Sequence, residues 1–118
     1  MITILPADEA KTIELAQKEQ VSLPVYAMSM TEGLNELGYV LYCVDNDVLE
    51  IVRLFSCDSF LEEGLVRAAL NDGVNRQAVT AVCRDTSLFF LLESLGFSQK
   101  EGSMTIFIPD FFSKPCHH

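Results

Sequence analysis

The hydrophobic positions of the chain follow two periods, one typical of strands and one typical of helices. Apolar and β-branched residues dominate 38–44 and 48–55, and the Asp-Asn-Asp segment over 45–47 suits a tight hairpin turn between them. The next period is helical and runs to Gly73, and a short apolar strand over 78–83 follows. Because strand, helix and strand in this order normally connect by a right-handed crossover, we expect the last strand to lie parallel to the strand over 48–55.

The flanking segments extend this pattern into a mixed sheet. Further strands are predicted over 2–5, 23–30 and 104–108, and further helices over 8–20 and 88–95. Pro24 confines its strand to an edge or a strand start, and the helix over 88–95 is so apolar that we expect it to be buried on more than one side. The sequence therefore predicts an α+β fold in one domain over 1–118, antiparallel first, with a parallel β-α-β crossover in the middle, and antiparallel again at the end.

Local signals place the ends of the helices. Ser59 followed by Glu62 fits a capping box for the central helix, and Gly73 suits the left-handed residue that ends it. Asp85 is the N-cap candidate of the helix over 88–95, and Pro109 is expected to stop the last strand. These signals predict where each element begins and ends.

Charge and composition narrow the classes of function. Seventeen acidic and eight basic residues give a net charge of −9, whose field repels nucleic acid and anionic lipid, so neither is expected as a partner. The N-terminal segment carries no basic residue before Lys11, and Pro6 interrupts its apolar run; this predicts neither an export signal nor a membrane span and favours a cytoplasmic protein. The apolar residues Phe111 and Phe112 should pack on the sheet or on a second subunit.

The four cysteines form no C-x-x-C pair and are expected to be free thiols. The C-terminal segment 116–118 (Cys-His-His) combines three potential metal ligands, but adjacent ligands at a chain end rarely close a site, so no metal is expected. Cys57 precedes a helix, where the dipole could stabilise a thiolate. With no His near it in the sequence, a small buried cysteine is the simpler interpretation.

Two segments are similar to motifs of the GNAT N-acetyltransferases. The run LFSCDSFLEEG over 54–64 occupies the place of a strand end, a linker and the turn that binds coenzyme A in that family, with Phe60 where the family often has Tyr. The run LLESLGF over 91–97 is similar to the family's closing L-Y-E-K-L-G-F. The resemblance spans residues 23–108. It implies acetyl-CoA or CoA in a cleft between two diverging parallel strands, with the pyrophosphate at the N-terminus of the following helix.

The family's cofactor motif, Q/R-x-x-G-x-G/A, falls on residues 61–66, where only Gly64 agrees. Leu61 removes a donor, and Glu62 and Glu63 bring negative charge. One full charge about 5 Å from a phosphate costs roughly 3 kcal/mol at an effective dielectric near 20. The same acids can instead simply stabilise the start of a helix. By resemblance, the pantetheine arm of the cofactor would be held by Ser56 and Cys57. Its phosphates would be held by Gly64, Leu65, Val66 and Arg67.

Glu50 is the candidate general base, because strand alternation places it with Val48, Val52 and Leu54 on one face of the sheet. Desolvation there would raise the pKa of its carboxyl group. Alternatively, Glu50 or Arg53 pairs with a neighbour across an exposed face.

Other positions have lost or changed the family's chemistry. The family's proton-donating Tyr is Leu92 here, and the Asn frequent at the start of that helix is Asp85. Tyr39 and Tyr42, on opposite faces of one strand, either reach a cleft as donors or pack across strands.

Two hypotheses follow. The first is a GNAT-fold, acyl-CoA-dependent N-acetyltransferase-like protein of reduced or lost activity, acting on a small-molecule or peptide amine. The alternative is a non-catalytic GNAT-like module that binds a protein or forms a homodimer. They differ in whether the cleft between the strands ending at Phe55 and Arg84 is open or is filled by Leu61 and Val66.

Overall fold

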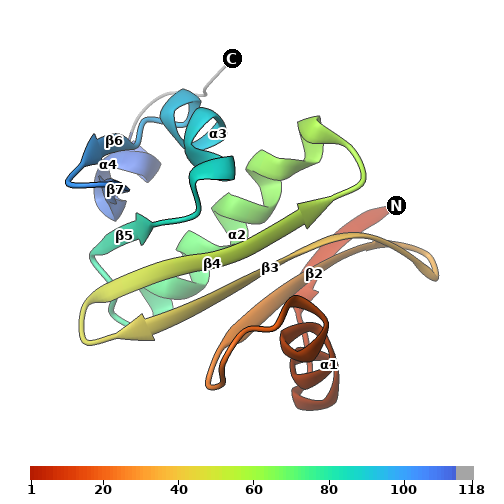
Figure 1. The fold of residues 1–118 in the computed structure, drawn as a ribbon. Helices are drawn as coiled ribbons and strands as arrows, with labels where there is room; N and C mark the ends of the chain where they lie inside the picture. The colour runs from red at the N-terminus through yellow and green to blue at the C-terminus, as the bar shows by residue number, and fades with distance from the viewer. Residues whose placement is uncertain (114–118) are drawn as a thin grey trace.

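A seven-stranded mixed sheet forms the centre of the structure, a computed structural model that describes residues 1–113 (Figure 1). The strand order is β1-β2-β3-β4-β5-β7-β6, and every neighbouring pair is antiparallel except β4 with β5. The strands are β1 (Ile2–Pro6), β2 (Tyr26–Glu32), β3 (Asn35–Asp45), β4 (Val48–Ser56), β5 (Thr80–Cys83), β6 (Ser98–Lys100) and β7 (Ser103–Phe107). The mixed sheet with one central parallel crossover is thus confirmed.

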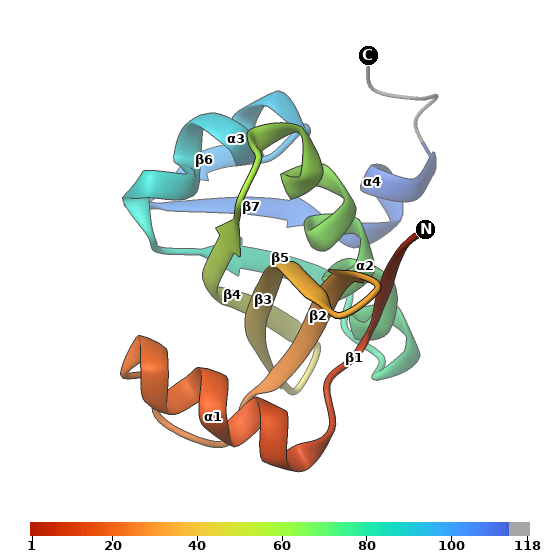
Figure 2. The ribbon, with the colours of Figure 1, turned by 90° about the vertical axis from the view of Figure 1, so that its right-hand side faces the viewer.

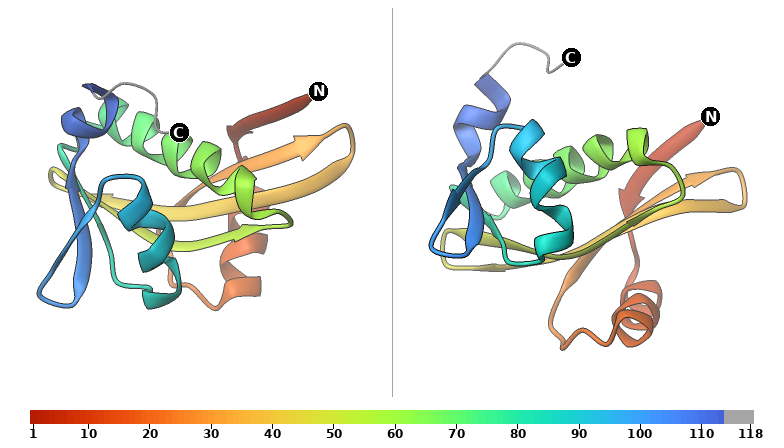
Figure 3. Two further views of the ribbon diagram at one scale, coloured as in Figure 1. Left: turned by 90° about the horizontal axis from the view of Figure 1, so that it is seen from above. Right: turned by 45° about the horizontal axis from the view of Figure 1, so that its top comes forward.

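Helices cover the two faces of this sheet unequally. The helices are α1 (Glu9–Glu19), α2 (Glu62–Asn75), α3 (Phe89–Ser94) and α4 (Ile108–Ser113), with short 3-10 helices η1 (Ser59–Leu61) and η2 (Thr86–Leu88). Helix α1 lies on one face, while α2 and α3 lie on the other (Figures 1 and 2). Helix α2 crosses over β2, β3 and β4 (Figure 3). None of the helices within 1–113 has both the length and the apolar character needed to cross a membrane.

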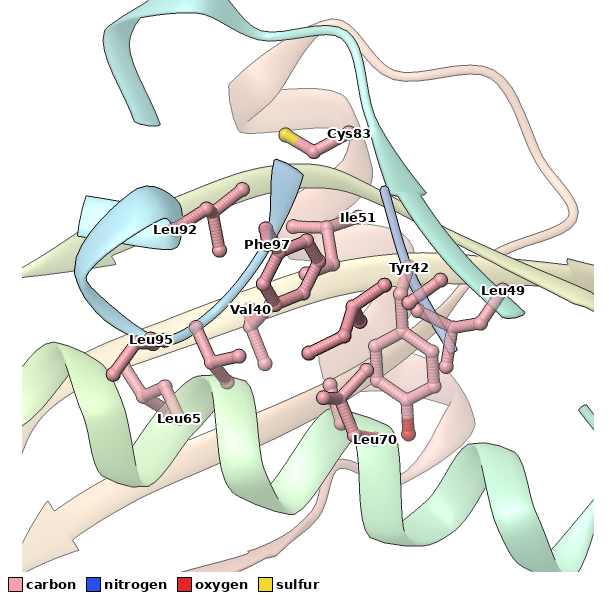
Figure 4. Packing of buried hydrophobic residues seen from close by; sticks show 14 of the residues in the cluster. Val40, Tyr42, Leu49, Ile51, Leu65, Leu70, Cys83, Leu92, Leu95 and Phe97 are labelled. Atoms are coloured by element: carbon pink, nitrogen blue, oxygen red, sulfur yellow. The ribbon is translucent and has the colours of Figure 1, made fainter. Parts of the chain in front are cut away.

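Two clusters of buried side chains hold these layers together. The larger lies between the sheet and α2, where Leu65 lies beside Leu95 and Leu70 lies beside Tyr42 (Figure 4). The smaller lies beneath α1 and consists of Leu15, Ala27, Tyr39 and Leu41. The face of the sheet under α1 is therefore packed mainly at β2 and β3.

A β-bulge in β4 changes which residues share a face. Leu41 of β3 pairs with Arg53, but Tyr42 pairs with Ile51, so Val52 is an extra residue in β4. Ile51 and Leu54 both pack against the larger cluster. The prediction that Glu50 and Leu54 lie on one face is therefore wrong, because the bulge reverses the alternation between them.

The predicted end signals of α2 are wrong as well. Ser59 does not cap α2: the carboxylate of Asp58 caps η1, accepting from the N–H of Phe60 at 3.3 Å, and α2 follows with Leu61 at its N-cap and no side-chain cap. Gly73 lies inside α2, where a Cβ would come within 2.6 Å of Leu49 Cδ1, so glycine permits close packing on the sheet. The left-handed residue comes later, at Gln77. At α1, by contrast, the predicted span of 8–20 agrees with a helix over Glu9–Glu19.

The apolar segment over 88–95 and the aromatic residues near the C-terminus follow the expectations in part. Leu88, Leu92 and Leu95 are buried and Phe89 and Leu91 pack against the larger cluster, but Phe90 is 87% exposed, so one side of α3 faces the solvent. Pro109 does not merely stop the last strand. It lies in the first turn of α4, a helix that was not predicted and where a missing N–H costs no hydrogen bond. Phe111 is buried in this helix, as expected, and Phe112 packs edge-on against it with the ring centroids 5.1 Å apart.

Tyr39 and Tyr42 project to opposite faces of β3, as predicted. The Tyr39 hydroxyl donates to Glu19 of α1, and the Tyr42 hydroxyl donates to Asp72 of α2 at 2.6 Å. Figure 4 shows the Tyr42 oxygen pointing at α2. Burial, and then the hydrogen bond to a carboxylate, raises the pKa of both phenols above the ordinary value of 10.0. Both tyrosines thus anchor helices and stay protonated in the folded protein.

We expect the free energy of unfolding to fall as the pH rises above 10. The unfolded tyrosines release their protons near that pH, whereas folding keeps the phenols of Tyr39 and Tyr42 neutral. The stabilisation that comes from keeping the two phenols neutral is fully present below pH 10. Above pH 10, each tyrosine lowers the free energy of unfolding by up to about 1.4 kcal/mol for each further pH unit. Urea unfolding at a series of alkaline pH values measures this slope. Tyr42→Phe should make it shallower, and an identical slope in the variant would contradict the assignment.

Candidate functional site

Strands β4 and β5 pair over a short length and then diverge. Val48 to Ile51 of β4 pair with Thr80 to Cys83 of β5, and β4 then continues to Ser56 with no strand on that side. Figure 1 shows β4 running well past the end of β5. A cavity of about 540 Å³ occupies the divergence, and its lining residues are Glu50, Ile51, Val52, Arg53, Arg84, Asp85 and Thr86. We call this cavity the notch.

The two side chains that could have filled the notch lie elsewhere. Val66 is fully buried in the larger cluster, and Leu61 packs partly against the same cluster. Neither belongs to the lining of the notch. The cleft between the two strands is therefore open.

Glu50 lies at the rim of the notch, on the face of the sheet opposite α2. Its register partners are Cys43 in β3 and Val82 in β5, and its Oε2 lies 3.0 Å from Nη1 of Arg84. The Glu50 side chain is 34% exposed and that of Arg84 is 65% exposed. Glu50 therefore forms an ion pair across the exposed face of the sheet, as the alternative interpretation expected, and its partner is Arg84. Arg53, the other residue considered for such pairing, donates from Nη1 to the carbonyl of Val52 at 2.8 Å.

A second hollow lies on the same face, beside the β3-β4 hairpin. Its volume is about 420 Å³, and it is lined by Cys43, Asp45, Asn46, Asp47, Val48, Glu50, Val82 and Arg84. Glu50 and Arg84 belong to both linings, so their ion pair stands between the notch and this acidic hollow.

The turn between β4 and α2 uses most of its own backbone donors. Of the six N–H groups from residue 57 to residue 62, five donate to acceptors within the protein. The pairs are Cys57 N–H to Leu37 O (2.9 Å), Asp58 N–H to Ser56 Oγ (3.2 Å), Phe60 N–H to Asp58 Oδ1 (3.3 Å), Leu61 N–H to Asp58 O (3.1 Å) and Glu62 N–H to Ser59 O.

The charged and small residues of this turn also have partners. Arg67 pairs with Glu63 at 3.2 Å, and its guanidinium lies 5.0 Å from the centre of the Phe111 ring. Partial burial raises the pKa of Glu62. A Cβ at Gly64 would meet Ile4 Cδ1 at 3.3 Å, so its open side faces β1. The side of Gly64 that lacks a side chain therefore lies against Ile4 of β1 and Met30 of β2.

Solved structures with the same architecture settle the fold. An acetyltransferase of the GNAT family from Staphylococcus aureus superposes with a TM-score of 0.68 at 10% identity, over 92% of this chain and 99% of that chain. The ribosomal-protein-S18-alanine N-acetyltransferase of Escherichia coli gives 0.69 at 14% identity, over 92% and 94%. PaiA N-acetyltransferase from Thermoplasma acidophilum, solved in complex with coenzyme A, gives 0.58 at 13% identity, over 80% and 65%. The chain has the GNAT fold.

Sequence comparison adds no closer relative. A scan against protein-family models finds no match, and a search of curated proteins finds no significantly similar sequence. The predicted resemblance to GNAT proteins is confirmed at the level of the fold.

The three positions at which the resemblance implied catalytic or binding groups differ in their chemistry and exposure. Glu50 is a carboxylate at an open rim, but Leu92 is fully buried in the core and has no proton to donate (Figure 4). Asp85 caps η2 by accepting from the N–H of Ser87 at 3.1 Å and from its hydroxyl at 2.7 Å. Its position is explained by the local helix start.

The cysteines within 1–113 differ in their exposure. Cys57 is exposed, so the expectation of a buried cysteine is wrong for it, because it lies in the turn that leaves the sheet. Burial raises the pKa of Cys83 to about 11. The three cysteines within 1–113 form no disulfide, and no three His, Cys, Asp or Glu side chains in that range are grouped to hold a metal ion. Cys116, His117 and His118 lie outside the described residues.

The residues of this turn are a poor match for the pyrophosphate of coenzyme A. An anion at a helix N-terminus needs free N–H groups and positive charge, whereas here five of the six N–H groups of residues 57–62 already have acceptors and Asp58, Glu62 and Glu63 bring negative charge to the same turn. The side chains of Leu65 and Val66 are fully buried, so these two residues could reach a phosphate only through their backbone, and the contacts predicted for Gly64, Leu65, Val66 and Arg67 stay a prediction.

Two residues of the site were missed by sequence reasoning. Arg84 follows β5 directly, and only the parallel register of β4 and β5 brings it to Glu50. Asp58 stands next to Ser59, and both residue types cap helices, so the sequence alone did not show which of them does.

Proposed function

We propose that this chain is an acyl-CoA-dependent N-acetyltransferase-like protein of the GNAT fold, with reduced activity. The observation that carries the proposal is the open notch between the diverging strands β4 and β5, with the carboxylate of Glu50 at its rim. Beyond Ile51 the β5 side of β4 has no strand partner, so an extended arm of a thioester substrate could lie along it. In this proposal Ser56 and Cys57 lie near the far end of that arm.

The amine that receives the acetyl group would enter from the second hollow. Asp45, Asp47 and Glu50 line this hollow, and their charge favours a cationic amine over an anionic acceptor. Acetyl transfer needs one group that accepts a proton from the amine and another that protonates the departing thiolate. Glu50 can do the first, and the buried Leu92 cannot do the second, which is why we propose reduced activity.

We expect Glu50→Gln to lower the rate of acetyl transfer to a small primary amine by about 100-fold, since general base catalysis typically contributes at least that much. A thiol-reactive dye that reports release of coenzyme A measures the rate. The control Glu93→Gln also removes one negative charge, at an exposed position of α3 that does not line the notch, and it should leave the rate unchanged. An unchanged rate in Glu50→Gln would remove Glu50 from catalysis. No heat of binding and no melting shift with millimolar acetyl-CoA or CoA would reject the enzyme altogether.

The second candidate is a non-catalytic GNAT-like module that binds a protein or a second copy. It is favoured by the face of the sheet that α1 leaves open, where Phe107 is 53% exposed. Exposed rings of this size are common at protein contacts. A monomer in analytical ultracentrifugation at tens of micromolar would count against the homodimer.

A further inference from the structure

The donor site of the proposed function has two halves, the notch and the turn before α2, and they differ in what they can bind. At one half, the notch is open and the β5 side of β4 lacks a strand partner beyond Ile51. At the other half, the turn before α2 uses five of the six N–H groups of residues 57–62 for its own hydrogen bonds, and one of them, that of Phe60, donates to the carboxylate of Asp58. The first half suits the neutral pantetheine arm, and the second half suits no phosphate.

The negative charge of the turn before α2 also disfavours the binding of a phosphate group. Asp58, Glu62 and Glu63 lie within two turns of one another, and the nearby cation, Arg67, is paired with Glu63 and stacked on Phe111. The chain as a whole carries a net charge of −9. The nucleotide of coenzyme A brings several further negative charges, so its approach to this turn is opposed by the local field and by the overall field.

We propose that this site recognises its donor through the acyl-pantetheine arm alone and gains no affinity from the nucleotide. The substrate class is then pantetheine thioesters, and acetyl-CoA is bound no better than acetyl-pantetheine, which lacks the nucleotide and its phosphates. This inference rests on the proposed function, because it requires that the notch binds the arm.

Calorimetric titration of the full chain with acetyl-pantetheine and with acetyl-CoA, at low and at high salt, tests the inference. We expect dissociation constants within about threefold of each other at high salt. At low salt we expect acetyl-CoA to bind more weakly, because screening no longer reduces the repulsion. Acetyl-pantetheine should be insensitive to salt and should compete with acetyl-CoA for one site.

The outcomes separate the inference from the proposed function. Binding of acetyl-CoA ten or more times tighter than acetyl-pantetheine, or weakened by salt, overturns the inference and leaves the proposed function standing. Failure of both ligands to bind at millimolar concentration overturns both, since the shared arm then has no site.

Two variants that each remove three negative charges test whether the turn before α2 is what excludes the nucleotide. The triple variant Asp58→Ser, Glu62→Gln, Glu63→Gln keeps a capping side chain and removes three charges, and it should bind acetyl-CoA at least tenfold tighter with acetyl-pantetheine unchanged. The control Glu32→Gln, Glu93→Gln, Glu101→Gln removes three exposed charges elsewhere. An equal gain in both variants would mean that overall charge, and not the closed turn, excludes the nucleotide, and would overturn the inference.

Discussion

Replacing Gly38 with alanine should lower the free energy of unfolding by about 3 kcal/mol, measured by urea unfolding, because the new methyl group has no space. A Cβ at position 38 would lie 2.5 Å from the carbonyl oxygen of Phe55 and 3.1 Å from Cα of Ser56. Both are backbone atoms of β4, so relief requires the strand itself to move. Leu65 Cδ1, also at 3.1 Å, closes the remaining side.

Gly64→Ala is the matched control for this substitution. Its nearest neighbours would be Ile4 Cδ1 at 3.3 Å and Met30 Cε at 3.5 Å, which are the ends of flexible side chains. Alanine also favours a helix over glycine by about 1 kcal/mol, so stability should be unchanged or slightly higher. Equal losses at both positions would contradict the view that backbone crowding at Gly38 is special.

Much of the fold could be predicted because it follows from local signals. The turn over 45–47 combines residues that tolerate a left-handed backbone, and Asn46 indeed has a φ of 58°. The crossover from β4 through α2 to β5 follows from the order of the periods, since the right-handed connection is nearly obligatory. Local chemistry was sufficient for these elements.

The departures arise where distant parts of the chain decide the structure. Nothing in the sequence of β4 marks Val52 as a bulge, because the bulge is a property of its pairing with β3. Gly73 has the chemistry of a helix stop but is needed for contact with Leu49 on the sheet. Pro109 is as acceptable in the first turn of a helix as after a strand.

In the candidate site, too, features set by the local sequence could be predicted and features set by distant contacts could not. Glu50 could be chosen from the sequence because it is a carboxylate inside an apolar strand that precedes the crossover. Its partner Arg84 could not be chosen, because their distance of 3.0 Å depends on how β4 and β5 align. The missing phosphate motif was visible in the sequence, but its replacement by an internal cap, Asp58, required the geometry of the turn. Absent chemistry is thus easier to detect from sequence than the contacts that take its place.

Leu65→Ala should cost about 3 kcal/mol of unfolding free energy without changing the binding of acetyl-pantetheine. Leu65 is fully buried between α2 and the sheet (Figure 4), and truncation of a buried leucine typically costs about 2–5 kcal/mol through lost contacts and a cavity. Phe90→Ala, at a side chain that is 87% exposed, is the control and should change stability by no more than about 0.5 kcal/mol.

Urea unfolding and calorimetric titration well below the melting temperature measure the two effects of Leu65→Ala separately. A role of Leu65 in binding, as the resemblance implied, would weaken the ligand together with the fold. Loss of affinity at an unchanged stability would place its side chain at the notch and contradict the buried position described here.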